Sequence, residues 1–539
     1  MKTVILLIAS LCAGAAWLPG QSIPHLQKKG GATQLVVEGK PYLVIGGELG
    51  NSSTGSLEYM KPIWRQLREL NLNTALPVIS WELIEPEEGK FDFTLVDAMI
   101  EGARKENLKL VPLWFGTWKN GMSSYVPLWV KKDYERFPRV KTQDFGSVEI
   151  ISTFSEEALE ADARAFAALM RHIKEIDAEH QTVIMMQVEN EVGVLGDSRD
   201  RSAPAEAAYR GPVPRKLLDH LQANKDNLIP ELEAMWASTG FQTSGSWEEV
   251  FGGGVRTEEV FMAWNYAVYM DKVTEAGKAE YALPMYVNAW LNGSHYGHAV
   301  EKPGHWPSGG PLPHVMNIWR AGGPHIDFIS PDIYQPNFAE WCDRYTQLDN
   351  PLFIPETGRS AQSAANILYA FGKYNTIGTS PFAIDRLSPG DDGPIEQTYS
   401  VLRYLAPYIL ESQGKEKTMT GFLIDRANPT IDVELGGYNI HAGLYTRRGV
   451  IGVDDAHGII IATGEDEFLV AGSRAMVSFS SLEAPQEKAG IGPVTEIVNT
   501  DGEWKPGRRL NGDETSRGTA VRLPHDEVGV QRVTVYRYR

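Results

Sequence analysis

The sequence is poor in cysteine and has no long uninterrupted apolar segment. Its 539 residues include only Cys12 and Cys342. Because Cys12 lies in the leader-like start described below, one cysteine remains, which excludes an intramolecular disulfide and leaves core size as the source of stability. Beyond that start no stretch approaches the roughly 18 apolar residues of a transmembrane helix, so we expect no membrane span.

Positive charge is also scarce. The chain carries 51 Lys and Arg against 69 Asp and Glu, which gives a formal net charge of −18. Nucleic acids and anionic membrane surfaces are bound through basic surfaces, so this balance argues against both as main partners. Apolar residues make up 42% and charged residues 22%, the proportions of ordinary globular domains with a buried core. Neither number indicates an oligomeric state.

The first residues have the order of a secretory signal peptide. Lys2 is followed by the apolar stretch Val4–Ala16, which is too short to span a bilayer, and then by a Pro-Gly pair. We expect a signal peptide over residues 1–20 and export to the periplasm or the medium, which the sequence does not distinguish. Anchoring as a lipoprotein is disfavoured, because Leu11 is larger than the residue usually found before a lipidated cysteine.

Apolar strand-like runs alternate with amphipathic helix-like stretches over residues 21–412. This alternation predicts parallel strands covered by helices, and eight units favour a closed (β/α)8 TIM barrel over an open doubly wound sheet. A helix-like insertion at about 196–280 separates the fourth and fifth units. The expected strands are Tyr42–Ile45, Thr74–Trp81, Leu108–Phe115, Thr182–Val188, Met285–Trp290, Ile326–Tyr334, Leu352–Pro355 and Thr379–Ile384.

The pattern changes after the last helix-like stretch, Ile395–Ser412. Over residues 418–539 the chain is rich in Gly, Thr and Val, with short strand-like runs separated by turn signals. Such spacing predicts a smaller all-β, sandwich-like domain. The fold class is therefore an α/β barrel followed by a β-domain, which either binds polysaccharide or supports the barrel.

Several common catalytic signatures are missing. No G-x-x-x-x-G-K-[ST] or G-x-S-x-G motif occurs, and no G-x-G-x-x-G follows an expected strand. His295, His298 and His305 are close in sequence, but their loop is rich in Gly, Pro and Trp and lacks supporting carboxylate spacing. A zinc site is therefore disfavoured. We expect neither a metal nor an organic cofactor.

Carboxylates at strand ends remain as candidates for chemistry. In an α/β barrel, active-site groups lie at the carboxyl ends of the strands. Glu48 follows the first strand, Glu189 and Glu191 follow the fourth, and Glu356 follows the seventh. The fourth and seventh strands face each other across the barrel mouth. Strand alternation places Glu189 and Glu191 on the same face, so periodicity alone does not choose between them.

The residues around the fourth strand resemble a known signature. Residues 187–193, Q-V-E-N-E-V-G, are similar to the Q-V-E-N-E-Y-G sequence of glycoside hydrolase family 35, the β-galactosidases, with Val192 in place of the Tyr. Residues 72–74, 81–82 and 85–93 resemble the second-strand region of the same family. The run 113–121 is closer to bacterial members, which grade into family 42. The resemblance covers about residues 30–412 and is weaker over the β-domain.

The resemblance implies a role for the matching residues. It places the acid/base at Glu191, beside Asn190, and the nucleophile at Glu356. It also implies that Tyr334 donates a hydrogen bond to the nucleophile. Polar and aromatic side chains at strand ends suit a carbohydrate site, so the further substrate-binding candidates are Asn190, Asn288, Trp290, Trp114, Trp118 and Glu48. For Glu48, pairing with a cation is an equal alternative.

The expected function is that of an exported, retaining, exo-acting β-galactosidase. It would hydrolyse terminal β-galactosides of plant-type oligo- or polysaccharides by a two-glutamate double displacement. One alternative is another retaining β-glycosidase of the same clan, such as an endo-β-glucanase or a β-mannanase. The other is a non-catalytic carbohydrate-binding protein, which is disfavoured because binding alone needs no carboxylate pair.

Overall fold

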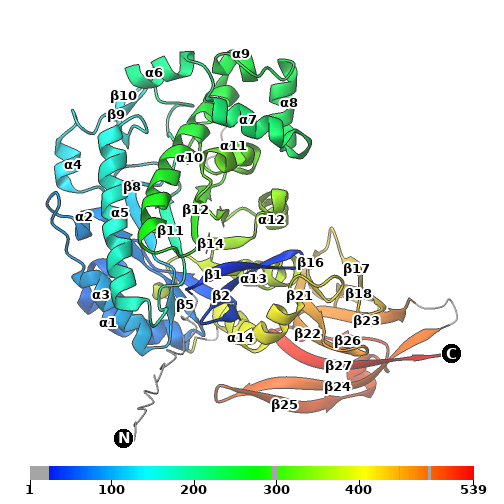
Figure 1. The fold of residues 1–539 in the computed structure, drawn as a ribbon. Coiled ribbons are helices and arrows are strands. Elements are labelled where there is room, and N and C mark those ends of the chain that lie inside the picture. Colours follow the sequence, from blue (N-terminus) through cyan, green and yellow to red (C-terminus); the bar gives the residue numbers. More distant parts are fainter. Residues whose placement is uncertain (1–22, 294–300, 392, 448–449, 483–486) are drawn as a thin grey trace, which may run out of the picture.

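The computed structural model describes residues 23–293, 301–391, 393–447, 450–482 and 487–539. The expected signal peptide, His295 and His298 lie outside these residues. Figure 1 shows a helix-covered barrel in blue to yellow, with a group of sheets in orange and red beside it. No helix in the described part of the chain is long and apolar enough to cross a membrane.

Eight parallel strands close into a barrel, which confirms the expected fold class. Each strand pairs with the next, and the last pairs with the first to complete the ring. The second and third strands are each interrupted beside a proline, Pro77 and Pro112, which has no N–H for the ladder. The strands are β4 (Val44–Glu48), β5 (Thr74–Leu76) with β6 (Val78–Ser80), β7 (Lys109–Leu110) with β8 (Leu113–Lys119), β11 (Met186–Asn190), β12 (Met285–Trp290), β13 (Phe328–Ile333), β14 (Phe353–Thr357) and β15 (Gly378–Pro381).

A small antiparallel sheet covers the amino-terminal end of the barrel. It consists of β1 (His25–Lys29), β2 (Ala32–Val37) and β3 (Lys40–Tyr42). Leu35 and Val37 are buried in the same apolar cluster as Val44 and Phe353, which fill the barrel interior. The expected first strand, Tyr42–Ile45, is thereby divided between β3 and β4. Only the carboxyl end of the barrel is left for a site.

Amphipathic helices surround the barrel. Helix α1 buries Met60, Ile63, Trp64 and Leu67, one face at helical spacing, and the side chain of Ser56 caps its first turn. The barrel helices are α1 (Leu57–Glu69), α2 (Trp81–Ile84), α3 (Thr94–Lys105), α4 (Leu128–Lys132), α5 (Glu156–Asp177), α11 (Met316–Gly322), α12 (Phe338–Tyr345), α13 (Ala361–Lys373) and α14 (Pro394–Ser412). The hairpin of β9 (Arg139–Thr142) and β10 (Gly146–Ile151) precedes α5.

A group of helices lies between β11 and β12, where the sequence predicts a helical insertion. It forms the upper part of Figure 1 and comprises α6 (Ala203–Arg210), α7 (Arg215–Ala223), α8 (Pro230–Ser238), α9 (Trp247–Phe251) and α10 (Val255–Glu280). Helix α10 packs along α5, with Gly277 against the ring of Phe166. The long α10 therefore belongs to the wall of the barrel, and the shorter helices extend that wall.

The C-terminal region is all-β. A six-stranded sheet, in the order β16-β21-β22-β27-β24-β25, packs on a four-stranded sheet, β17-β18-β23-β26, through one apolar cluster. The first sheet also packs on α13, where Gly372 lies against Gly421. The strands are β16 (Met419–Asp425), β17 (Thr430–Leu435), β18 (Tyr438–Leu444), β19 (Thr446–Arg447), β20 (Val450–Ile451), β21 (Asp455–Ala462), β22 (Glu467–Ser473), β23 (Ala475–Ser481), β24 (Lys488–Thr500), β25 (Glu503–Leu510), β26 (Val521–Arg522) and β27 (Gly529–Tyr538).

Candidate active site

Four acidic side chains meet where the barrel strands end. Glu48 ends β4, Glu191 follows β11, Asp332 lies near the end of β13 and Glu356 lies in β14. Their exposed fractions are 1%, 6%, 2% and 8%. Buried acidic side chains are rare unless they are paired or serve a function. The structure thus brings Glu48, Glu191 and Glu356 together and adds Asp332, which sequence reasoning did not assign to the site.

Three of these carboxyls form a tight group. One oxygen each of Glu191, Asp332 and Glu356 lies within 4.8 Å of the other two. The register of β13 and β14 sets Asp332 beside Glu356. Asn288 joins the other pair: its Oδ1 accepts a hydrogen bond from the Glu191 backbone N at 3.0 Å, and its Nδ2 donates to Asp332 Oδ2 at 2.7 Å. Asn288, predicted to bind substrate, therefore ties the carboxyl of Asp332 to the backbone of Glu191.

Tyr334 contacts one carboxyl of this group. Its hydroxyl donates a hydrogen bond of 2.5 Å to Oε1 of Glu356. Burial and the charge of Glu356 raise the pKa of Tyr334, so that the hydroxyl keeps its proton. Tyr334 directly follows β13 and has 45% of its surface exposed at the barrel mouth. The contact that the resemblance implied is therefore present.

Lys119, at the end of β8, is a residue that sequence reasoning missed. It is 7% exposed, and its Nζ donates to Asn190 Oδ1 at 2.9 Å. Burial by itself lowers the pKa of Lys119, but the charges of Glu356, Glu191 and the other carboxyls outweigh it and raise the pKa. Lys119 is thus a buried cation among acids. Its position at the end of the apolar run of the third strand could have identified Lys119 as a site residue from the sequence.

The acidic group holds protons at neutral pH. Burial and then the charge of Glu356 raise the pKa of Glu191 to about 7, against the lowering effect of Lys119. The same two causes, in the same order, raise the pKa values of Glu48 and Asp332 well above the ordinary range. Carboxyls this close cannot all be ionised together. The site can therefore offer both a proton donor and an ionised carboxylate.

Glu189 turns away from this group. The φ angles of Glu189 and Glu191 are 59° and 47°, in the left-handed region, which breaks the regular alternation expected of the strand. The carboxyl of Glu189 accepts hydrogen bonds from the backbone N of Thr117 at 2.9 Å and of Trp118 at 2.7 Å, and lies beside Asp162 of α5. The backbone conformation thus directs Glu189 and Glu191 to different places, although strand periodicity had placed both on the same face.

Two tryptophans predicted to contact substrate are core residues, and this part of the expectation is wrong. Trp114 and Trp118 are fully buried. The indole of Trp114 donates to Asp162 at 2.9 Å, and that of Trp118 donates to the backbone O of Ile151 at 3.1 Å. Both rings fill the space between β8 and the surrounding helices. Trp290, at the end of β12, is partly exposed and stays a candidate for contact with a sugar.

Several buried polar atoms at the barrel mouth have no hydrogen-bond partner within the protein. They include Glu48 Oε1, Asn190 Nδ2, Asp332 Oδ1 and Glu356 Oε2. Buried polar groups are nearly always paired, so a cluster of unpaired ones indicates a place for a polar ligand. A molecule with several hydroxyls, which both donate and accept, would satisfy acceptors and donors together.

The same carboxyls deserve comparison with a metal site. Within the described residues, Glu191, Asp332 and Glu356 are the one group of three possible ligands close enough to share an ion. An all-carboxylate set suits a hard cation such as Mg²⁺ or Ca²⁺, but these ions usually take six or more oxygens. Lys119 already supplies positive charge to the group. The absence of a metal stays a prediction.

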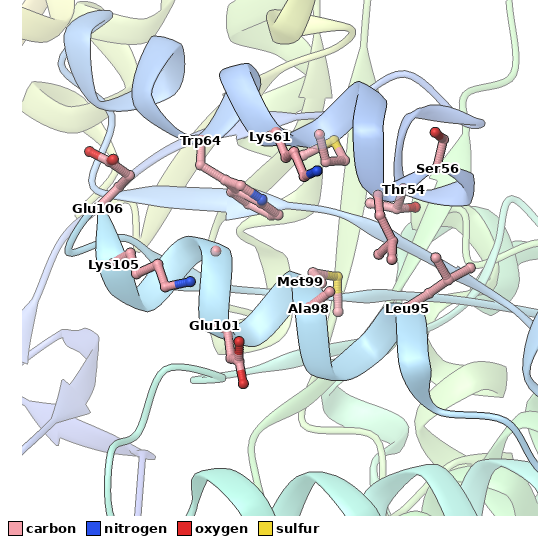
Figure 2. A pocket seen from close by; sticks show the side chains of 13 residues that line it. Thr54, Ser56, Lys61, Trp64, Leu95, Ala98, Met99, Glu101, Lys105 and Glu106 are labelled. Carbon is pink, nitrogen blue, oxygen red and sulfur yellow. The ribbon is translucent and has the colours of Figure 1, made fainter.

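A separate hollow lies on the outside of the barrel, between α1 and α3 (Figure 2). Its volume is about 280 Å³. The ring of Trp64, from α1, lies along one side of the hollow. Glu101 and Lys105 lie along the other side, on α3. Its lining comes from the helical layer and η1 (Ser53–Gly55), not from strand ends. The hollow therefore shares no lining residue with the cluster of acidic side chains at the barrel mouth.

Comparison with known proteins points to one class of enzyme. Residues 53–261 match the family 42 glycoside hydrolase model described as beta-galactosidase. This segment, 209 of the 539 residues, is similar to that family. It includes Glu191 and ends before Glu356. Residues 395–522 match a domain of unknown function, DUF5597. The matched family is 42, and membership of family 35 stays a prediction.

Curated relatives are similar over part of the chain. A beta-galactosidase of Xanthomonas manihotis is 28% identical over 216 residues, 39% of this chain and 33% of that protein. Beta-galactosidase 14 of Arabidopsis thaliana is 26% identical over 203 residues, 35% of this chain and 21% of that protein. The aligned part of the chain thus spans a third or less of these relatives.

Solved structures resemble the chain over a larger part. A β-galactosidase from the psychrophilic Marinomonas ef1 has a TM-score of 0.45 at 12% identity, covering 69% of this chain and 60% of that one. A β-galactosidase from Bacillus circulans sp. alkalophilus has the same TM-score at 16% identity, covering 68% and 57%.

Proposed function

We propose that the protein is a retaining glycoside hydrolase that removes terminal β-galactosyl groups. The observation that carries this proposal is the pair Glu191 and Glu356, whose carboxyl oxygens approach within 4.8 Å. Retaining enzymes place their two carboxyls about 5 to 5.5 Å apart, whereas inverting enzymes need about 6.5 to 9.5 Å to admit a water. The 4.8 Å bound applies to one oxygen of each carboxyl, and it is compatible with the closer, retaining spacing, in which one carboxylate attacks directly.

The two glutamates divide the chemistry by their surroundings. Glu356 attacks the anomeric carbon as a carboxylate, while Glu191 gives its proton to the leaving oxygen, so that the glycosidic bond breaks and a glycosyl-enzyme forms. Glu191, now ionised, takes a proton from water, and the hydroxide oxygen displaces Glu356 with a second inversion. A pKa of about 7 suits Glu191 to both halves of the cycle.

Neighbouring groups support these roles. Tyr334 holds Oε1 of Glu356 through its hydroxyl, while no N–H or hydroxyl group reaches Oε2 and the carboxyl of Glu48 lies beside Glu356. Lys119 donates to Oδ1 of Asn190, which fixes the amide and leaves its buried Nδ2 as an unpaired donor. A hydrogen bond from such a donor to the 2-hydroxyl of the sugar strengthens in the transition state.

The proposed sugar and cellular setting come from similarity and from the sequence. Galactose is proposed because the matched family and the curated relatives carry that name. Plant-type oligo- or polysaccharides as substrate, exo action, export to the periplasm or medium, family 35 membership and the lack of a cofactor are proposed on the sequence and its resemblance alone. The β-domain then either binds the polysaccharide or supports the barrel.

Proton NMR during hydrolysis of an aryl β-galactoside tests the proposal. The expected result is β-galactose as the first product, before mutarotation, with no product from the E356Q variant at equal concentration. First release of α-galactose would contradict retention. Cleavage of aryl β-glucosides or β-mannosides alone would contradict the sugar and favour the related β-glycosidases, and no cleavage of any glycoside would favour a carbohydrate-binding protein.

A further inference from the structure

Asp332 belongs to neither role of the two-glutamate mechanism, yet it is the least exposed of the three grouped carboxyls. We propose that Asp332 is a positioning residue that remains protonated throughout the cycle and donates a hydrogen bond to the carboxyl of Glu191. The mechanistic part of this inference rests on the proposed function. The protonation of Asp332 does not, and it is testable by itself.

The contacts of Asp332 carry the first step. Its Oδ2 accepts a hydrogen bond of 2.7 Å from Asn288, while its Oδ1 is buried without any N–H or hydroxyl donor. One oxygen of Asp332 lies within 4.8 Å of an oxygen of Glu191 and of an oxygen of Glu356, and the side chains of Asp332 and Glu191 are in hydrogen-bond contact. An ionised carboxylate in this place would have one donor and two acidic neighbours. A protonated carboxyl instead turns a neighbouring carboxylate into an acceptor for its own O–H.

Asn288 selects Glu191 as that acceptor. The same amide that donates to Asp332 Oδ2 accepts from the backbone N of Glu191 at 3.0 Å, so one side chain ties Asp332 to the Glu191 segment. Glu356 already receives the hydroxyl of Tyr334 on Oε1. Because Oδ2 of Asp332 accepts from Asn288, its Oδ1 is free to carry the proton. That O–H then donates a hydrogen bond to the carboxyl of Glu191.

The electrostatic surroundings agree with this arrangement. Burial, followed by the charges of Glu356, Glu191 and Glu48, raises the pKa of Asp332 well above its ordinary range. The contact with Asp332 in turn lowers the pKa of Glu191. The ionisable groups that face Asp332 from the surrounding elements are Glu191, Glu356, Glu48, Lys119, Tyr286, Tyr334 and Tyr345.

The hydrogen bond from Asp332 would strengthen as the reaction proceeds. When Glu191 passes its proton to the leaving oxygen it becomes a carboxylate, and a hydrogen bond to a charged acceptor is roughly twice as strong as one between neutral groups. Only interactions that are stronger in the transition state accelerate the chemical step. The proton of Asp332 stays on Asp332, and Glu191 recovers its own proton from water.

Two substitutions separate this role from bulk packing. In D332N the amide oxygen can still accept from Asn288 while the amide N–H₂ donates to Glu191, so it mimics the protonated acid. In D332L the shape is similar but no donor remains. We expect D332N to keep kcat/KM within about tenfold and the basic limb of its pH profile in place, and D332L to lose about 10- to 100-fold with alkyl β-galactosides.

The leaving group supplies a second readout. Activated aryl galactosides need little proton donation, so D332L should lose much less activity with them than with alkyl galactosides. The basic limb of D332L should move to higher pH, because the Glu191 carboxylate loses a donor and its pKa rises. D177N serves as the matched control: Asp177 is equally buried but bonds to Arg104 and the backbone N of Val183, outside the site.

Three results would overturn the inference. A basic limb displaced downward by a unit or more in D332N would mean that the substitution removed a negative charge, so that Asp332 is ionised in the native site. Equal profiles for D332L and D332N would show that no donor matters, and an equal loss with both leaving groups would show a merely structural role. Thermal unfolding of each variant confirms that folded protein is compared.

Infrared spectroscopy keeps the test independent of activity. The difference spectrum of wild type minus D332N at neutral pH should show the carbonyl band of a protonated carboxylic acid. A carboxylate band in its place would contradict the protonation of Asp332 whether or not any glycoside is cut. Failure of the wild type to cleave glycosides, with the acid band present, would instead contradict only the proposed function and the catalytic use of the hydrogen bond.

Discussion

Two buried acidic clusters each take one glutamate from the end of β11, Glu189 or Glu191, and they differ in how their oxygens are paired. The wall pair, Glu189 and Asp162, accepts hydrogen bonds from the backbone N of Thr117 and Trp118 and from the indole of Trp114. In the mouth cluster, Glu48, Glu191, Asp332 and Glu356, three of the four members have a buried oxygen that no N–H or hydroxyl group reaches, and the acids contact one another instead.

The difference teaches which cluster serves folding and which serves chemistry. A buried acid whose oxygens are paired holds strands and helices together, whereas unpaired buried oxygens are costly and are kept where a ligand completes them. Gly116 shows how closely the wall pair is fitted. A Cβ there would lie 2.4 Å from Glu189 Oε1 and 2.3 Å from the indole N of Trp114, so no larger residue fits.

The largest loss of activity is expected from E356Q. The amide is similar in size but cannot attack the anomeric carbon, so kcat/KM should fall by about 10⁴-fold or more. Steady-state kinetics with an aryl β-galactoside measures the loss, and circular dichroism checks that the barrel is intact. Residual activity above a hundredth of the wild-type value would assign the nucleophile to another member of the mouth cluster.

Removal of the acid should depend on the leaving group. E191A should lower kcat/KM by about 10²- to 10⁴-fold for alkyl galactosides, because no other group protonates the leaving oxygen. Activated aryl galactosides should form the glycosyl-enzyme at a nearly unchanged rate, and added azide should speed its breakdown, because the anion attacks without a general base. The same loss for both leaving groups would remove Glu191 from the acid/base role.

The pH profile should carry the signature of the mouth cluster. Glu191 must be protonated to act as an acid, so kcat/KM should fall as pH rises through about 7. Above that point the decline should be about tenfold per pH unit. In E191A, assayed with an activated substrate, this basic limb should vanish. Its persistence there would assign the titration to another group, with Asp332 and Glu48 as the next candidates.

The sequence predicts the barrel but not the contents of its mouth. Alternating apolar runs are enough for eight strands and for glutamates at strand ends, since those features are local, whereas the choice of Glu191 over Glu189 came from the family resemblance. Asp332 and Lys119 were missed because their meaning comes from the closure of the ring, which sets strands distant in sequence side by side. Trp114 was misread for a related reason: its strand position faces the helices, and a single apolar run does not show which face is inside.

E189Q tests most directly whether the wall pair serves folding and the mouth cluster serves catalysis. Glu189 accepts one backbone N–H on each oxygen, and an amide nitrogen in place of one oxygen would face a donor. This should cost about 1–3 kcal/mol in the free energy of unfolding, measured by urea denaturation, because a buried donor is left unpaired. The folded fraction should keep kcat/KM within about tenfold of wild type, with the same basic limb.

E191Q is the matched control, because it changes the other glutamate of the same motif. It should cost activity and little stability. A loss of activity in E189Q as large as in E191Q would make the wall pair part of the catalytic machinery and would remove the distinction between satisfied and unsatisfied acids on which the site is assigned.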